Sequence, residues 1–80
     1  MNQTEGEAIA QLGYVDYMTS LHFNEETNQF KLPEEMRKHL AKRLSDIEIV
    51  IGFISDRDDE HGIMKIWGTL ANILDVEATV

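Results

Sequence analysis

The segment Ser45-Asp46-Ile47-Glu48-Ile49-Val50-Ile51-Gly52-Phe53-Ile54 contains the longest apolar run of the chain, and two different folds follow from its conformation. Every second residue from Ile47 to Phe53 is apolar and most are β-branched, which is typical of a strand with a buried middle. The run also fits the spacing i, i+3, i+4, i+7 of a helix with Ser45 as N-cap. The residues at that spacing are Ile47, Val50, Ile51 and Ile54. We expect the strand, because of the β-branched residues and Gly52, and the helix is the alternative.

An alternating pattern also occurs earlier in the chain, in residues 13–23. Its apolar and aromatic members are Val15, Tyr17, Leu21 and Phe23. A polar turn, Asn24 to Asn28, follows, and the alternation resumes over Gln29-Phe30-Lys31-Leu32. Asn is favoured in turns because it tolerates left-handed backbone. Residues 13–32 are therefore predicted to form a β-hairpin.

A helix is predicted to begin at Pro33, which is well suited to a first helical turn because its φ is already fixed. Acidic residues follow at once and basic residues come later, in the order that the helix dipole favours. Three apolar residues at four-residue intervals form the expected buried stripe. They are Met36, Leu40 and Leu44.

The last third of the chain is predicted to form a second hairpin and a short helix. Residues 47–53 and 63–67 are the expected strands, residues 55–62 are a polar loop, and Thr69 is the expected N-cap of the final helix. The predicted fold class is therefore α+β, with two β-hairpins, an intervening helix and a short C-terminal helix. The alternative is an all-α helical bundle with helices over residues 46–55 and 59–74.

We expect one domain, because 80 residues with 42% apolar content can bury one small core. Residues 13–75 are predicted to form that globular domain. Residues 1–12 are expected to be a weakly ordered N-terminal segment, and residues 76–80 a frayed tail.

Residues 19–74 resemble the MraZ/AbrB group of swapped-hairpin DNA-binding proteins. The resemblance rests on Leu32, Pro33 and Arg37, which match an "LPxxxR" segment, and on the order of the elements. It implies a dimer with interlocked hairpins and DNA binding through Lys31 and Arg37. The chain departs from the family's pattern at Asn28 and Gln29, where the family usually has a glycine and a basic residue.

Charge is distributed very unevenly along the chain, whose net charge is −8. Residues 1–30 carry five acids and no Lys or Arg, residues 31–44 carry five bases and two acids, and residues 45–80 carry two bases and eight acids. Such a layout selects partners by the sign of their potential without specifying a reaction. There is no cysteine, no apolar segment long enough to span a membrane, and no basic and apolar leader at the amino terminus. We therefore expect a cytoplasmic protein.

The sequence predicts no enzyme, metal or cofactor. His22, His39 and His61 belong to three different elements, and none completes a nucleophile–base–acid motif. The acidic loop from Asp56 to Glu60 does not match an EF-hand, which needs Gly at its sixth position and Glu at its twelfth.

Two functions fit the charge layout. In the first, the chain is a small acidic binding protein that inhibits or sequesters a basic, nucleic-acid-handling protein, and resembles antitoxins and phage inhibitors such as anti-CRISPR proteins and DNA mimics in size and charge. We expect the partner-binding residues to lie in two exposed turns at one end of a sheet, with the single tryptophan as an interface anchor. These residues are Glu25, Glu26, Asp56, Asp58, Asp59, Glu60 and Trp67.

In the second, the chain is an AbrB-like dimeric transcriptional regulator whose basic segment binds DNA phosphates. The expected nucleic-acid-binding residues are Lys31, Arg37, Lys38, Lys42 and Arg43. We favour the first function, because the net charge is a property of the whole chain.

Overall fold

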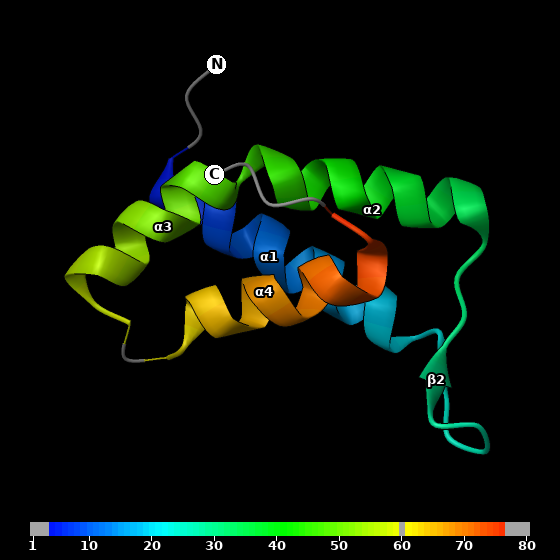
Figure 1. Cartoon of the computed structure of the whole chain (residues 1–80). Coiled ribbons are helices and arrows are strands. Elements are labelled where there is room, and N and C mark those ends of the chain that lie inside the picture. Colours follow the sequence, from blue (N-terminus) through cyan, green and yellow to red (C-terminus); the bar gives the residue numbers. More distant parts are fainter. Residues whose placement is uncertain (1–3, 60, 77–80) are drawn as a thin grey trace.

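The computed structural model describes residues 4–59 and 61–76, which form four helices and one small hairpin (Figure 1). The elements in chain order are α1 (Glu5–Ser20), β1 (Phe23–Asn24), β2 (Gln29–Phe30), α2 (Glu34–Asp46), α3 (Glu48–Arg57) and α4 (Ile63–Leu74). The fold is therefore a helical bundle with a β-hairpin appendage. The predicted α+β class is wrong, and the all-α alternative fits the structure better. No helix among the described residues is long and apolar enough to cross a membrane.

Helix α1 occupies the segment that was expected to be a loose tail followed by a strand. It begins with a capping box, in which Thr4 Oγ1 accepts a 3.1 Å hydrogen bond from the Glu7 backbone N–H, and Glu7 Oε1 accepts one from the Thr4 N–H. Ala8 and Leu12 are buried one turn apart, followed by Val15. The predicted domain boundary at residue 12 therefore falls inside a core helix. Of the predicted tail, residues 77–80 lie outside the described residues, and Val76 packs against the core.

The first hairpin is present in a shorter form than predicted. Phe23 pairs with Phe30 and Asn24 with Gln29, and the two phenylalanine rings pack with their centroids 4.8 Å apart. Asn24 Oδ1 accepts a 2.9 Å hydrogen bond from the Glu26 N–H, and Asn28 has a left-handed backbone with φ of 60°. The turn lies where it was predicted except that Asn24 belongs to β1, whereas most of the expected first strand belongs to α1.

Helix α2 confirms the sequence prediction. It begins directly after Pro33, and Leu40 and Leu44 are buried while Met36 packs against the core. It ends at Asp46, and α3 begins only two residues later.

Both segments that were expected to be strands are helical, in α3 (Glu48–Arg57) and α4 (Ile63–Leu74), so the predicted second hairpin is wrong. Ile47 just before α3 and Ile51 within it are fully buried, whereas Ile49 and Phe53 face solvent. Residues two positions apart lie on the same face of a strand, whereas residues four positions apart lie on the same face of a helix. Ile47 and Ile51 are buried and Ile49 between them is exposed, so the burial follows the helical period. Thr69, the expected N-cap, lies in the middle of α4, which begins after Gly62 with a left-handed φ of 62°. Glycine adopts that conformation without steric cost.

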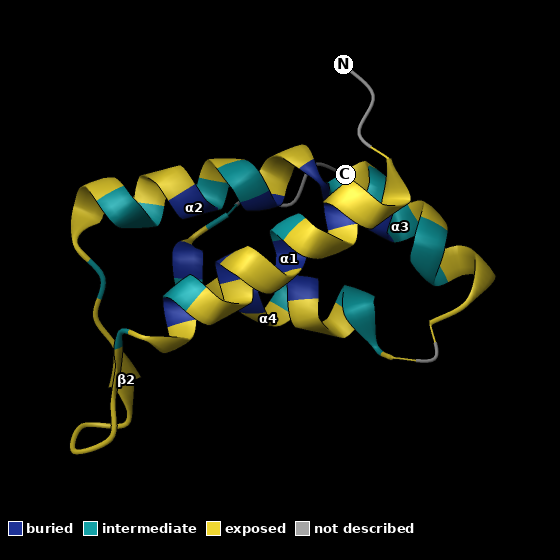
Figure 2. Ribbon diagram, turned by 180° about the vertical axis from the view of Figure 1, so that it is seen from behind, coloured by how far each residue is buried: buried dark blue, intermediate teal, exposed yellow. Residues whose placement is uncertain are grey.

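The core lies where all four helices meet, as the buried faces in Figure 2 show. Helix α4 contacts each of the other three helices and contributes the largest buried side chain, Trp67. The remaining core residues are Ala8, Leu12, Val15, Leu40, Leu44, Ile47, Ile51, Leu70, Ala71 and Leu74.

Candidate partner-binding surface

The outward face of α3 carries two large apolar side chains that nothing in the described fold covers. Ile49 is 71% exposed, the highest value among the large apolar residues that the structure describes. Phe53 is 63% exposed, a value that only Tyr17 of the remaining described residues of this kind equals. Asp56 lies on the same face, because residues i, i+4 and i+7 of a helix are stacked one above another. We call Ile49, Phe53 and Asp56 the α3 strip.

The loop that follows α3 extends this surface with carboxylates. Asp58 and Asp59 are exposed, and the Asp59 Oδ1 lies 3.5 Å from the Met64 N–H at the start of α4. Glu60, which was also expected in the site, lies outside the described residues. The α3 strip therefore leads directly into an acidic loop.

The basic residue that ends α3, Arg57, is neutralised within the fold. Arg57 Nη2 donates to the Glu5 carboxylate of α1, and this ion pair raises the pKa of Arg57 above its ordinary value. The positive charge of Arg57 is therefore compensated, and the end of the molecule formed by α3 and its loop stays acidic.

The two acidic turns predicted to form one site lie at opposite ends of the molecule. Figure 1 shows the hairpin at one end of the bundle and the α3–α4 loop at the other, and the principal extent of the fold is 39 Å. Glu25 and Glu26 are exposed in the hairpin turn, but they do not join Asp56 and Asp59 on one surface. The expectation that both turns share one end of a sheet is therefore wrong.

Trp67 is not a surface anchor in this structure. Its side chain is 4% exposed, and its indole N–H donates a 2.8 Å hydrogen bond to the Leu44 carbonyl. We therefore leave Trp67 out of the candidate surface. Sequence reasoning missed Ile49 and Phe53 instead, because both were placed in a buried strand.

Two of the predicted DNA-binding residues hold the helices together. Arg37 Nη2 donates to Glu34 Oε1 at 2.6 Å, and Arg37 Nη1 donates to the Leu74 carbonyl at the end of α4 at 2.5 Å. The hydrogen bond between Arg37 and Glu34 is the main cause that lowers the pKa of the Glu34 carboxyl group, and it also raises the pKa of Arg37. The last carbonyl groups of a helix have no N–H donor within the helix, and the Arg37 guanidinium supplies one to the Leu74 carbonyl.

Arg43 connects α2 to α1. Its guanidinium carbon lies 5.1 Å from the centre of the Tyr14 ring, and its Nη1 donates a 2.8 Å hydrogen bond to Gln11 Oε1. A DNA phosphate would have to compete with these contacts.

The other three predicted bases are exposed. Lys42 forms an i,i+4 pair with Asp46 at 3.5 Å, and Lys31 and Lys38 also face solvent. Lys31 belongs to the segment after the hairpin, whereas Lys38 and Lys42 are on α2. The predicted basic set is therefore divided between structural and solvent-exposed residues.

No three or more His, Cys, Asp or Glu side chains within residues 4–59 and 61–76 are arranged to hold a metal ion. The class that the fold and surface define is a small acidic helical domain with a mixed apolar and acidic face. No family model, curated protein or solved structure matches the chain.

Proposed function

We propose that this chain is a small acidic, non-enzymatic binding protein that uses the α3 strip and the adjoining loop to occupy a basic surface on a protein partner. The observation that carries this proposal is the exposure of Ile49 and Phe53 in line with Asp56. Protein interfaces combine an apolar centre that loses its water with a polar rim that steers and orients the partner. Ile49 and Phe53 of the α3 strip supply the apolar centre, and Asp58 and Asp59 supply the polar rim.

The sign of the charge determines the kind of partner. A chain with net charge −8 repels acidic surfaces and is attracted at long range to basic ones. Proteins that handle nucleic acid present Lys and Arg to phosphates, and carboxylates can occupy the same groups. We therefore infer that the partner handles nucleic acid, and that binding inhibits or sequesters it because both ligands need one surface.

The experiment is affinity capture of the tagged chain from nuclease-treated host lysate, followed by competition of the captured protein with duplex DNA. Two double variants give a matched comparison. D56K/D59K changes the α3 end and E25K/E26K changes the hairpin end, and both carry −4 in place of −8 because each replacement adds two charges. We expect a discrete basic protein to be retained by the wild type and by E25K/E26K, lost with D56K/D59K, and displaced by DNA.

A third variant separates binding from folding. I49S/F53S removes two exposed apolar side chains that contribute nothing to the core, so its circular dichroism should match that of the wild type. Loss of the partner with this variant supports the α3 strip. Equal binding by all variants would contradict the proposal, and recovery of a DNA segment that is lost on nuclease treatment would favour direct DNA binding instead.

A further inference from the structure

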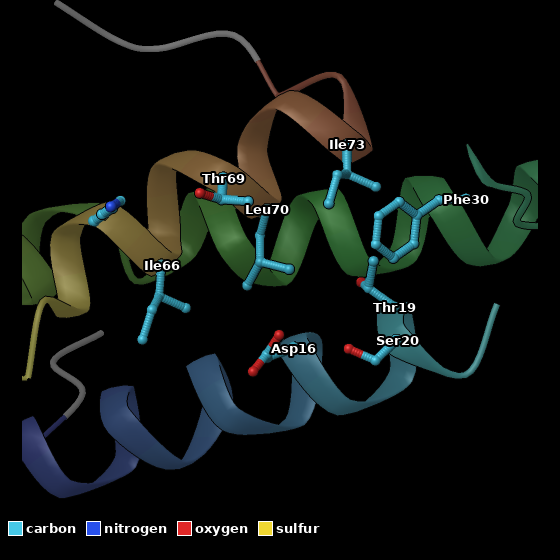
Figure 3. A pocket seen from close by; sticks show the side chains of 9 residues that line it. Asp16, Thr19, Ser20, Phe30, Ile66, Thr69, Leu70 and Ile73 are labelled. Atoms are coloured by element: carbon cyan, nitrogen blue, oxygen red, sulfur yellow. The ribbon is translucent and has the colours of Figure 1, made fainter. Parts of the chain in front are cut away.

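A pocket of about 260 Å³ lies between α1 and α4, away from the α3 strip (Figure 3). The α4 wall is mostly apolar, with Ile66, Leu70 and Ile73 facing α1, and Phe30 of the hairpin closes one end. The α1 wall is polar, with Asp16 and Ser20 facing α4. An engineered cavity of roughly 150 Å³ holds benzene, so this pocket has room for a ring and a few more atoms.

Two opposite charges line the pocket without pairing with each other. Asp16 is on α1 and Lys65 is on α4, and neither takes part in any ion pair within residues 4–59 and 61–76. Both side chains belong to exposed residues, so they form the rim. A carboxylate from α1 and an ammonium from α4 thus line the rim of a single pocket.

The pocket also contains a polar group that the fold leaves unsatisfied. Thr19 is fully buried among the lining residues, and its Oγ1 has no hydrogen-bond partner in the part of the chain that the structure describes. A buried hydroxyl without a partner costs free energy, and most such groups in folded proteins are paired. This orphan hydroxyl is independent of the rim charges and points to a ligand that supplies the missing partner.

We propose that this pocket binds a small zwitterion with one apolar group, the class to which free apolar α-amino acids belong. The ligand's ammonium pairs with Asp16 and donates to the Thr19 hydroxyl one turn further along α1. Its carboxylate pairs with Lys65, and its apolar group packs against Leu70 and Ile73. A ligand of either single charge would leave one rim residue uncompensated. This inference does not depend on the proposed partner, because the site lies on a different face.

The test is titration of the full chain with L-phenylalanine, observed by ¹H–¹⁵N NMR. We expect saturable shifts at about millimolar ligand, confined to amides of residues 16–20, 65–73 and Phe30. Two analogues are matched to the two charges. 2-Phenylethylamine lacks the carboxylate and 3-phenylpropanoate lacks the ammonium, and each should bind about tenfold more weakly, which corresponds to one lost charge-assisted contact.

Variants of the rim test the assignment of each charge. D16N should remove the preference for L-phenylalanine over 3-phenylpropanoate, and K65Q should remove the preference over 2-phenylethylamine. E25Q and K38Q make the same charge changes outside the pocket and should leave both preferences intact. The spectra also report whether each variant is folded. Absence of shifts at tens of millimolar ligand, equal binding of all three ligands, or unchanged preferences in D16N and K65Q would overturn the proposal.

Discussion

The indole N–H of Trp67 donates a 2.8 Å hydrogen bond to the backbone carbonyl of Leu44, and both residues are buried. This bond joins the middle of α4 to the last turn of α2. It explains how a large residue with a polar atom can occupy the centre of so small a core, because a buried indole N–H needs an acceptor.

Replacing Trp67 with Phe should therefore destabilise the fold without changing its helical content. The substitution removes the donor and part of the buried ring system, and we expect a loss of about 1–3 kcal/mol in the free energy of unfolding. Urea denaturation followed by circular dichroism measures this loss. A W67F variant as stable as the wild type would show that the hydrogen bond to Leu44 contributes nothing.

Two isoleucines of α3 give a direct test of the helical assignment. Ile51 is fully buried and Ile49 is 71% exposed. Ile51→Ala should cost about 2–5 kcal/mol, whereas Ile49→Ala should change stability by less than about 0.5 kcal/mol. In the strand that the alternating pattern suggested, both side chains would share one face and the two costs would be similar. Equal values in urea denaturation would therefore contradict the helix.

The two exposed apolar residues of α3, Ile49 and Phe53, explain why the fold class was hard to predict. Helix α2 was predictable because its Pro33 start, its charge order and its apolar spacing all agree. In α3, exposed Ile49 and Phe53 flank buried Ile51 and turn a helical period into an apparent alternation. A single sequence cannot separate these patterns in so short a run.

Helix α1 was obscured in a similar way. Tyr14 and Tyr17 are exposed aromatic residues on a helix whose buried face begins with Ala8 and Leu12. Large apolar side chains on several faces weaken the helical period, and tyrosine is also common in strands. The acidic residues of the candidate surface could be found from charge alone. The α3 strip could not, because the exposure of its apolar residues depends on the helix.

Arg37 should behave as a structural residue. Its guanidinium connects Glu34 to the Leu74 carbonyl, so Arg37→Gln should lower the melting temperature of the domain. Lys38→Gln removes one charge from the next position of α2 and is the matched control, because Lys38 is exposed. Differential scanning calorimetry compares the two variants. Equal melting temperatures would mean that the Arg37 contacts do not stabilise the end of α4.

Acid should weaken the start of α1. The Glu7 carboxylate accepts a hydrogen bond from the Thr4 N–H, and its contacts with Thr4 lower its pKa below the ordinary value of 4.5. Because the folded pKa lies below the unfolded one, this contribution to stability is complete above about pH 4.5 and is lost as the pH falls through the folded pKa.

The measurement is a carboxyl NMR titration of Glu7 in the wild type and in Thr4→Ala. We expect the Glu7 pKa to rise toward its ordinary value in the variant, because the side-chain half of the capping box is removed. Amides of residues 5–8 should exchange faster in Thr4→Ala than in the wild type. A wild-type Glu7 pKa that is not below its ordinary value would show that the capping box is not formed in solution.

Thr19 should show opposite effects on stability and on ligand binding. Valine has nearly the same shape as threonine, and Thr19→Val replaces an unpartnered buried hydroxyl by a methyl group. We expect the free protein to gain about 1 kcal/mol in stability, because no hydrogen bond is lost and a desolvation cost is removed. We also expect L-phenylalanine to bind more weakly to the variant, because the ligand loses a hydrogen-bonding partner in the pocket.

Ser20→Ala is the control for this substitution, since it removes the neighbouring hydroxyl from an exposed position of the same helix and should not raise stability comparably. Urea denaturation measures the first effect, and the NMR titration measures the second. A Thr19→Val variant that is less stable than the wild type would show that the hydroxyl has a partner in solution. In that case the threonine serves the fold, and the pocket loses one of the observations that point to a ligand.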